Sequence, residues 1–104
     1  MEINDYQSVA LTTAIYDREH DITYPLLGLV GEVGEFANKY KKVLRDGKEF
    51  SQDDMRSELG DILWYLAVLA SDCDLALGDI ATANIAKLED RQKRGVLGGS
   101  GDNR

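Results

Sequence analysis

The sequence has very little of what builds covalent cross-links, transition-metal sites or membrane spans. Its single cysteine, Cys73, cannot form an intramolecular disulfide, which favours a reducing compartment, and we expect it to be a buried structural thiol. Its single histidine, His20, gives no support to a zinc site or a di-iron Glu-x-x-His pattern, and we expect it on the surface. No apolar run approaches the roughly 18 residues of a membrane span, and the acidic start is unlike a signal peptide. We therefore expect a cytoplasmic protein without membrane contacts.

Positive charge is scarce as well. The 104 residues include 12 Lys and Arg against 19 Asp and Glu, which gives a formal net charge of −7. This balance argues against a nucleic-acid polymer as partner, because such a partner requires a basic surface. It does not exclude a phosphate substrate, because a bound metal ion can invert the local sign of the charge.

Strand signals are nearly absent too, because no stretch alternates polar and apolar residues with a period of two. Helical periodicity instead predicts an all-α chain. The only proline, Pro25, suits the first turn of a helix, and the run from Ser51 to Asp54 resembles a capping box. The predicted helices span residues 4–18, 25–45, 51–71 and 77–94, within one domain of residues 1–95 that is followed by a flexible, glycine-rich C-terminal tail of residues 96–104.

The third predicted helix carries a signal for assembly, because its residues 62–70 are apolar on every side. Such a helix must be covered on every side, and a chain this short has too few helices to enclose one of its own. We therefore predict a four-helix-type bundle that is completed by homodimerisation or by assembly as a dimer of dimers.

The most specific pattern is a pair of acidic doublets, Glu32/Glu35 and Glu58/Asp61, each of the form acid-x-Gly-acid. On a helix this spacing places the two carboxylates side by side, one turn apart. Two such helices packed together would gather four carboxylates, which repel one another unless a hard cation such as Mg²⁺ lies among them. Glycines recur around the acids although each costs about 1 kcal/mol relative to alanine in a helix interior, which suggests close approach of a backbone or a ligand. The alternative for the second helix is a solvated row of acids with Lys39 beside them.

A polar and cationic row lies on the fourth predicted helix. Its members Asn84, Lys87, Arg91 and Arg94 follow steps of three, four and three, so they share a face. Asn84 falls within the apolar stripe, where a buried amide needs a hydrogen-bond partner. Beside a cluster of carboxylates and metal, this row is well placed to hold phosphate oxygens. The alternative is a satisfied core asparagine next to basic side chains that extend to solvent.

Together these segments resemble the MazG-like nucleotide pyrophosphohydrolases, of the all-α nucleoside triphosphate pyrophosphatase superfamily. The resemblance runs from the second predicted helix through the fourth, with the order and approximate spacing of the motifs intact. In one departure, many members carry an acid immediately before the first glutamate, where this chain has Gly31. The matching segments are Leu29-Val30-Gly31-Glu32-Val33-Gly34-Glu35 with Lys39, Glu58-Leu59-Gly60-Asp61-Ile62-Leu63-Trp64-Tyr65, and Asn84-Ile85-Ala86-Lys87-Leu88 with Arg91.

The resemblance implies hydrolysis of a (deoxy)nucleoside triphosphate to the monophosphate and pyrophosphate, in nucleotide-pool control or house-cleaning. It implies Mg²⁺ as the cofactor, with Mn²⁺ able to substitute, and a helical bundle completed by dimerisation. The implied metal ligands and catalytic residues are Glu32, Glu35, Glu58 and Asp61, and the implied substrate contacts are Asn84 and Lys87, with Lys39 and Arg91 as helpers.

Two alternatives stay open. A non-enzymatic helical oligomerisation module would carry the same acids as surface charge and would release no pyrophosphate in the presence of Mg²⁺. A relative of narrower specificity, such as a phosphoribosyl-ATP pyrophosphatase or an all-α dUTPase, would share the chemistry and differ in the nucleotide. The base pocket is to be sought in the first predicted helix, the 21–24 turn and the aromatic residues.

Overall fold

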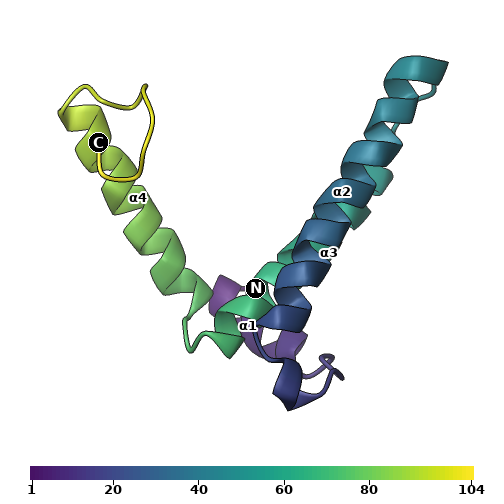
Figure 1. The fold of residues 1–104 in the computed structure, drawn as a ribbon, viewed down its shortest axis with the longest axis horizontal. Coiled ribbons are helices and arrows are strands. Elements are labelled where there is room, and N and C mark those ends of the chain that lie inside the picture. Colours follow the sequence, from purple (N-terminus) through teal and green to yellow (C-terminus); the bar gives the residue numbers. More distant parts are fainter.

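The computed structural model describes all 104 residues and contains helices but no strand (Figure 1). The all-α prediction is therefore confirmed. No helix combines the length and the apolar character needed to cross a bilayer. The elements in order are α1 (Ile3–Leu11), the short 3₁₀ helix η1 (Arg18–His20), α2 (Thr23–Asp46), α3 (Gln52–Asp72) and α4 (Leu77–Lys93).

Local signals in the sequence build the α2–α3 hairpin. Helix α2 ends at Asp46 because Gly47 takes a left-handed conformation, with φ of +68°, in which glycine lacks the steric penalty of other residues. Helix α3 begins with the predicted capping box: the Ser51 hydroxyl accepts from the Asp54 N–H at 3.0 Å, and the Ser51 N–H donates to the Asp54 carboxylate at 3.3 Å. The chain thus reverses and lays α3 along α2.

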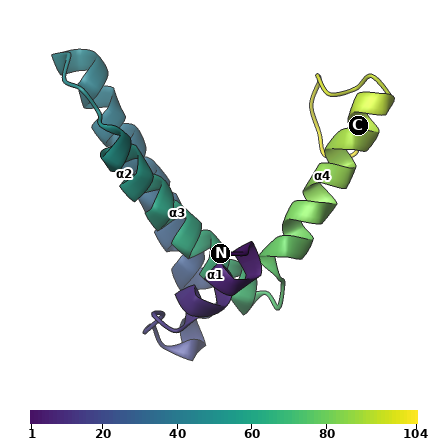
Figure 2. The ribbon, with the colours of Figure 1, turned by 180° about the vertical axis from the view of Figure 1, so that it is seen from behind.

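The helices form an open V rather than a closed bundle. In both views α2 and α3 share one arm, α4 forms the other arm, and α1 lies at the vertex (Figures 1 and 2). The core also lies at the vertex, where α1, α3 and the start of α4 meet. It consists of Ala10, Ala67, Ala70 and Leu77, with Tyr6 and Trp64 packed against it.

Two amide side chains of α1 fix the start of α4. Gln7 is buried; its Nε2 donates to the Leu75 carbonyl at 2.9 Å, and its Oε1 accepts from the Leu77 N–H at 2.8 Å. The Asn4 Oδ1 accepts from the Gly78 N–H at 2.8 Å. These contacts satisfy backbone N–H groups that the first turn of a helix leaves unpaired, so α1 holds the end of α4 from which the second arm extends.

The first helix is shorter than predicted, since α1 ends at Leu11 and not near residue 18. The Thr12 and Thr13 hydroxyls donate to the Val9 and Ala10 carbonyls at 2.6 and 2.7 Å and so satisfy the last carbonyls of the helix with side chains. The chain then turns through residues 12–17 into η1. The predicted bounds of the other three helices agree with the structure to within two residues.

The prediction that Cys73 is buried is wrong. Cys73 is the C-cap residue of α3 and is exposed, because it lies at the start of the turn that leads from α3 to α4. The surface position of His20, at the end of η1, is confirmed.

One chain leaves much of its apolar surface uncovered. Only 9 of 104 residues are buried. The accessible surface is 7544 Å², whereas a compact monomer of 11.5 kDa exposes about 5,800 Å². Within the all-apolar stretch of α3, Ala67 and Val68 are fully buried, but Leu66 is 39% exposed. A single chain therefore does not close a four-helix bundle, and the predicted homo-oligomer stays a prediction.

Candidate metal centre

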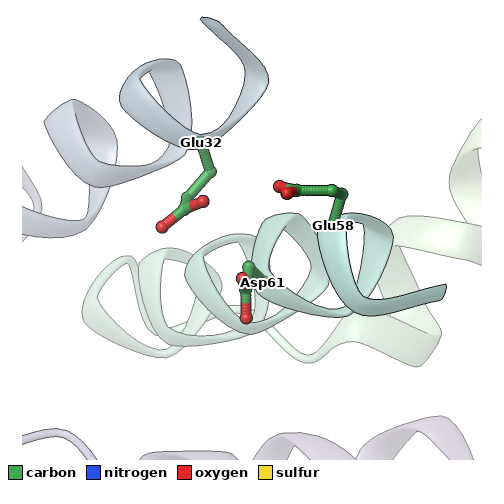
Figure 3. Close-up of side chains that lie close together, drawn as sticks. All are labelled: Glu32, Glu58 and Asp61. Carbon is green, nitrogen blue, oxygen red and sulfur yellow. The ribbon is translucent and has the colours of Figure 1, made fainter. Parts of the chain in front are cut away.

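The hairpin brings three of the four predicted acids together. Oxygen atoms of Glu32, Glu58 and Asp61 all lie within 4.8 Å of one another. Glu32 extends from α2 toward α3, where Glu58 and Asp61 lie one turn apart (Figure 3). The i, i+3 spacing places the last two on neighbouring turns, and the antiparallel packing of α2 against α3 brings Glu32 level with them.

The environment of these acids fits a hard divalent cation. Glu58 is buried, and the Oε2 atom of Glu32 is buried without a hydrogen-bond partner. Burial raises the pKa of Glu32, and the negative charges of Asp61, Glu35 and Glu58 raise it further. A buried carboxylate oxygen without a donor is costly. Carboxylate oxygens are the ligands that Mg²⁺ and Ca²⁺ prefer, so a cation among them would satisfy the orphaned atom and relieve the repulsion.

Lys39 partly neutralises the same group of acids. Its Nζ donates to the Glu58 Oε1 at 2.6 Å and lies 3.3 Å from the Glu35 Oε1. Its pKa is raised by the hydrogen bond to Glu58 first and then by Glu35. Glu35 is thus directed at Lys39 and stands outside the group of three, so the four-carboxylate site and the substrate role of Lys39 stay predictions.

Tyr65 borders the acids on the vertex side. A Cβ atom added to Gly28 would lie only 2.1 Å from the Tyr65 ring, so the ring packs directly on the backbone of α2. Burial raises the pKa of Tyr65, and Tyr24, Glu32 and Asp61 raise it further. The close approach expected at the glycines is therefore found at Gly28, where an aromatic ring provides it. At Gly31, Gly34 and Gly60 an added Cβ would meet nothing within 4 Å.

A second cluster, which sequence reasoning missed, anchors the start of α2. The side chain of Asp72 is fully buried and accepts from the Tyr16 hydroxyl at 2.6 Å and from the Ile22 N–H at 3.0 Å. Ile22 has φ of +68°, a conformation that is strained for a β-branched residue. Burial and the hydrogen bond to Asp72 raise the pKa of Tyr16, whose ring stacks on Tyr24. No short motif announces this contact, because 56 residues separate Tyr16 from Asp72.

The predicted substrate contacts on α4 do not meet the acids within one chain. Asn84 and Lys87 are exposed and line a groove of about 540 Å³ on the second arm of the V. Arg91 is buried and donates from Nη2 to the Asp102 carbonyl at 2.6 Å. The structure thus separates the anionic arm, α2 with α3, from the arm that carries these three residues (Figure 1).

Comparison with known proteins decides the family. Residues 21–96 match the model of the MazG nucleotide pyrophosphohydrolase domain. The chain belongs to this family. The Gene 37 protein of Mycobacterium phage L5 is 45% identical over 114 aligned residues, and the alignment covers all of both chains. Comparison with solved structures gives no significant match.

The MazG match spans α2, α3 and α4 and contains all eight residues predicted for the site. It begins after α1 and η1, the two elements that hold the vertex of the V. The resemblance noted in the sequence is therefore confirmed, and the acids of α2 and α3 are part of a MazG domain.

Proposed function

We propose that this MazG domain hydrolyses (deoxy)nucleoside triphosphates to the nucleoside monophosphate and pyrophosphate with Mg²⁺ as cofactor, in nucleotide-pool control or house-cleaning. The observation that carries the proposal is the buried, unpartnered Oε2 atom of Glu32, within a group of carboxylates whose oxygens lie within 4.8 Å of one another. A surface row of solvated acids would leave no such atom. This argues against the oligomerisation module without catalytic activity.

Glu32, Glu58 and Asp61 would hold the metal, and Glu35 would join them when its carboxylate leaves Lys39. When bound, Mg²⁺ would supply charge neutralisation at the triphosphate and activation of the attacking water. One carboxylate of the group would act as the general base or would orient the water. The ammonium of Lys39 lies beside Glu58 and can turn to a phosphate oxygen. We expect Mn²⁺ to replace Mg²⁺ among the same oxygen ligands.

The complete site requires more than one copy of the chain. Asn84 and Lys87 lie on the arm that diverges from the acids, so α4 of a second copy must supply them to the acid group. A compact monomer of this mass would expose about 1,700 Å² less than the 7544 Å² measured for one chain. That excess is of the size that obligate interfaces bury, about 1,000 Å² or more on each partner. We infer a homodimer or a dimer of dimers.

A substrate panel tests the proposal. Common and modified (deoxy)nucleoside triphosphates are incubated with Mg²⁺ and with excess chelator, and both products are measured by ³¹P NMR. The proposal predicts equal amounts of monophosphate and pyrophosphate, with no turnover in chelator. Release of orthophosphate and the nucleoside diphosphate, or no turnover of any nucleotide, would contradict it. Turnover confined to dUTP or to phosphoribosyl-ATP would instead identify one of the narrower relatives.

A further inference from the structure

Only two residues of α4 are buried, and they lie at opposite ends of the helix. Leu77 is covered at the vertex, where α1 packs on α4. Arg91 lies on the far part of the second arm and is 5% exposed. The segment 96–104, which folds back beside the last turns of α4, provides the cover (Figures 1 and 2).

Arginine side chains hold this segment in its folded-back conformation. Arg94 donates from Nη2 to the Arg104 carbonyl at 2.7 Å. Gly95, Gly99 and Gly101 have positive φ values, which allow the tight reversals of the chain. The Arg104 guanidinium donates to the carbonyls of Val96, Leu97, Gly98 and Gly101. Flexibility of this segment, expected from its composition, stays a prediction.

The folded-back segment places Asp102 against the cations of α4. The Asp102 carbonyl accepts from the Arg91 Nη2 at 2.6 Å. Its carboxylate lies 3.8 Å from the Arg91 Nη2 and 3.9 Å from the Lys87 Nζ. Carboxylate and phosphate oxygens bind arginine and lysine through the same charge-assisted contacts. Asp102 therefore occupies the position that a phosphate group would take between Lys87 and Arg91.

We propose that the 96–104 segment is an intramolecular competitor of the triphosphate, in which Asp102 neutralises Lys87 and Arg91 until substrate phosphates displace it. This inference rests on the proposed function for the phosphate-binding role of the two cations. The Asp102 carboxylate is 91% exposed, so its ion pairs are weak and are screened by salt. The contact is thus a displaceable competitor that sets the apparent affinity for substrate.

The substitution Asp102→Asn tests the competition, because it removes the carboxylate and keeps the backbone carbonyl that Arg91 binds. Glu89→Gln is the matched control: it removes one negative charge from α4, the helix that carries Lys87 and Arg91, but Glu89 lines a different groove with Ala81, Ile85 and Ala86. Binding of inorganic tripolyphosphate without metal is measured by calorimetry. Asp102→Asn should bind about two- to fivefold more tightly than wild type, the size expected of exposed ion pairs, and the difference should shrink in high salt.

The same variant should lower the KM for the nucleoside triphosphate and leave kcat unchanged. In a chain that also carries Arg91→Ala and Lys87→Ala, Asp102→Asn should have no effect on tripolyphosphate binding. Equal affinity of Asp102→Asn and wild type, or an equal gain in Glu89→Gln, would overturn the inference. If Asp102→Asn binds tripolyphosphate more tightly but no chain releases pyrophosphate, the proposed function fails and the competition stands.

Discussion

Glu32 and Lys39 show how the acids tolerate one another without a metal. Glu32 keeps one oxygen buried and unpartnered, whereas Glu58 obtains a cation from Lys39 at 2.6 Å. Lys39 Nζ also lies 3.3 Å from the Glu35 Oε1, so one ammonium contacts two acids. A divalent cation at these acids would therefore have to compete with the Lys39 ammonium.

Replacing Glu32 by Gln should stabilise the metal-free protein at neutral pH. Burial and neighbouring acids raise the pKa of Glu32 in the folded state, so the folded state binds this proton more tightly than the unfolded state. Protonated Glu32 therefore contributes to the free energy of unfolding of the wild type. This contribution is fully present below the pKa of Glu32 in the unfolded state and is lost as the pH rises through the raised pKa in the folded state. A glutamine at this position does not titrate. In denaturant titrations, the free-energy advantage of the variant should thus be larger at pH 7 than at pH 4. An advantage that is independent of pH would show that the charge of Glu32 is not the cause.

The fit of α3 against α2 depends on the missing side chain of Gly28. Its replacement by Ala places a Cβ 2.1 Å from the Tyr65 ring, so the ring must shift, at a cost of about 1–3 kcal/mol in the free energy of unfolding. Gly31→Ala is the matched control one turn away, where the added Cβ meets nothing within 4 Å and should add up to about 1 kcal/mol of stability. Chemical denaturation measures both. The same sign for the two variants would contradict the packing of Tyr65 on Gly28.

Helices α2, α3 and α4 could be predicted from the sequence because their signals are local. The capping box at Ser51, the left-handed Gly47 and the i, i+3 acid spacing each depend on residues within one or two turns. Repetition of that spacing on two helices predicted a meeting of four carboxylates, and the structure brings three of them, Glu32, Glu58 and Asp61, together.

The early end of α1 and the direction of α4 could not be predicted. The end of α1 is made by the Thr12 and Thr13 hydroxyls, which are a weak stop signal in a sequence. The direction of α4 depends on contacts between residues far apart in the sequence, such as Gln7 with Leu77. The orientation of Glu35 toward Lys39 depends on competition between two helices for one ammonium. Helical periodicity places Lys39 one turn after Glu35, but it does not show which acid of α3 shares the ammonium.

The open V leaves apolar side chains of its second arm uncovered in a single chain. The groove beside Asn84 and Lys87 includes Leu75 and Ile80, both exposed in one chain. Val68, although apolar, is fully buried within the chain itself, so a charge there would unfold one copy and would not report on assembly.

Ile80→Asp should dissociate the oligomer, because a lone charge in a buried apolar interface costs several kcal/mol. The apparent dissociation constant should rise by about a hundredfold or more. Ile15→Asp is the control, since Ile15 is fully exposed in the loop between α1 and η1. Sedimentation at micromolar concentration should show a dimer or tetramer for wild type and Ile15→Asp, and monomers for Ile80→Asp with loss of activity. A compact, active wild-type monomer would refute the shared site.

The substitution Asp61→Asn tests whether the acids of α2 and α3 form a metal site for triphosphate hydrolysis. The control is Asp53→Asn on the same helix, where the carboxylate is 91% exposed and paired with Arg56 outside the acid group. Pyrophosphate release is measured with Mg²⁺ and with chelator, alongside circular dichroism of each protein. We expect Asp61→Asn to stay folded and to lose about a hundredfold or more of kcat/KM, with Asp53→Asn like wild type. Near-wild-type turnover by folded Asp61→Asn, or wild-type turnover that persists in chelator, would contradict the account.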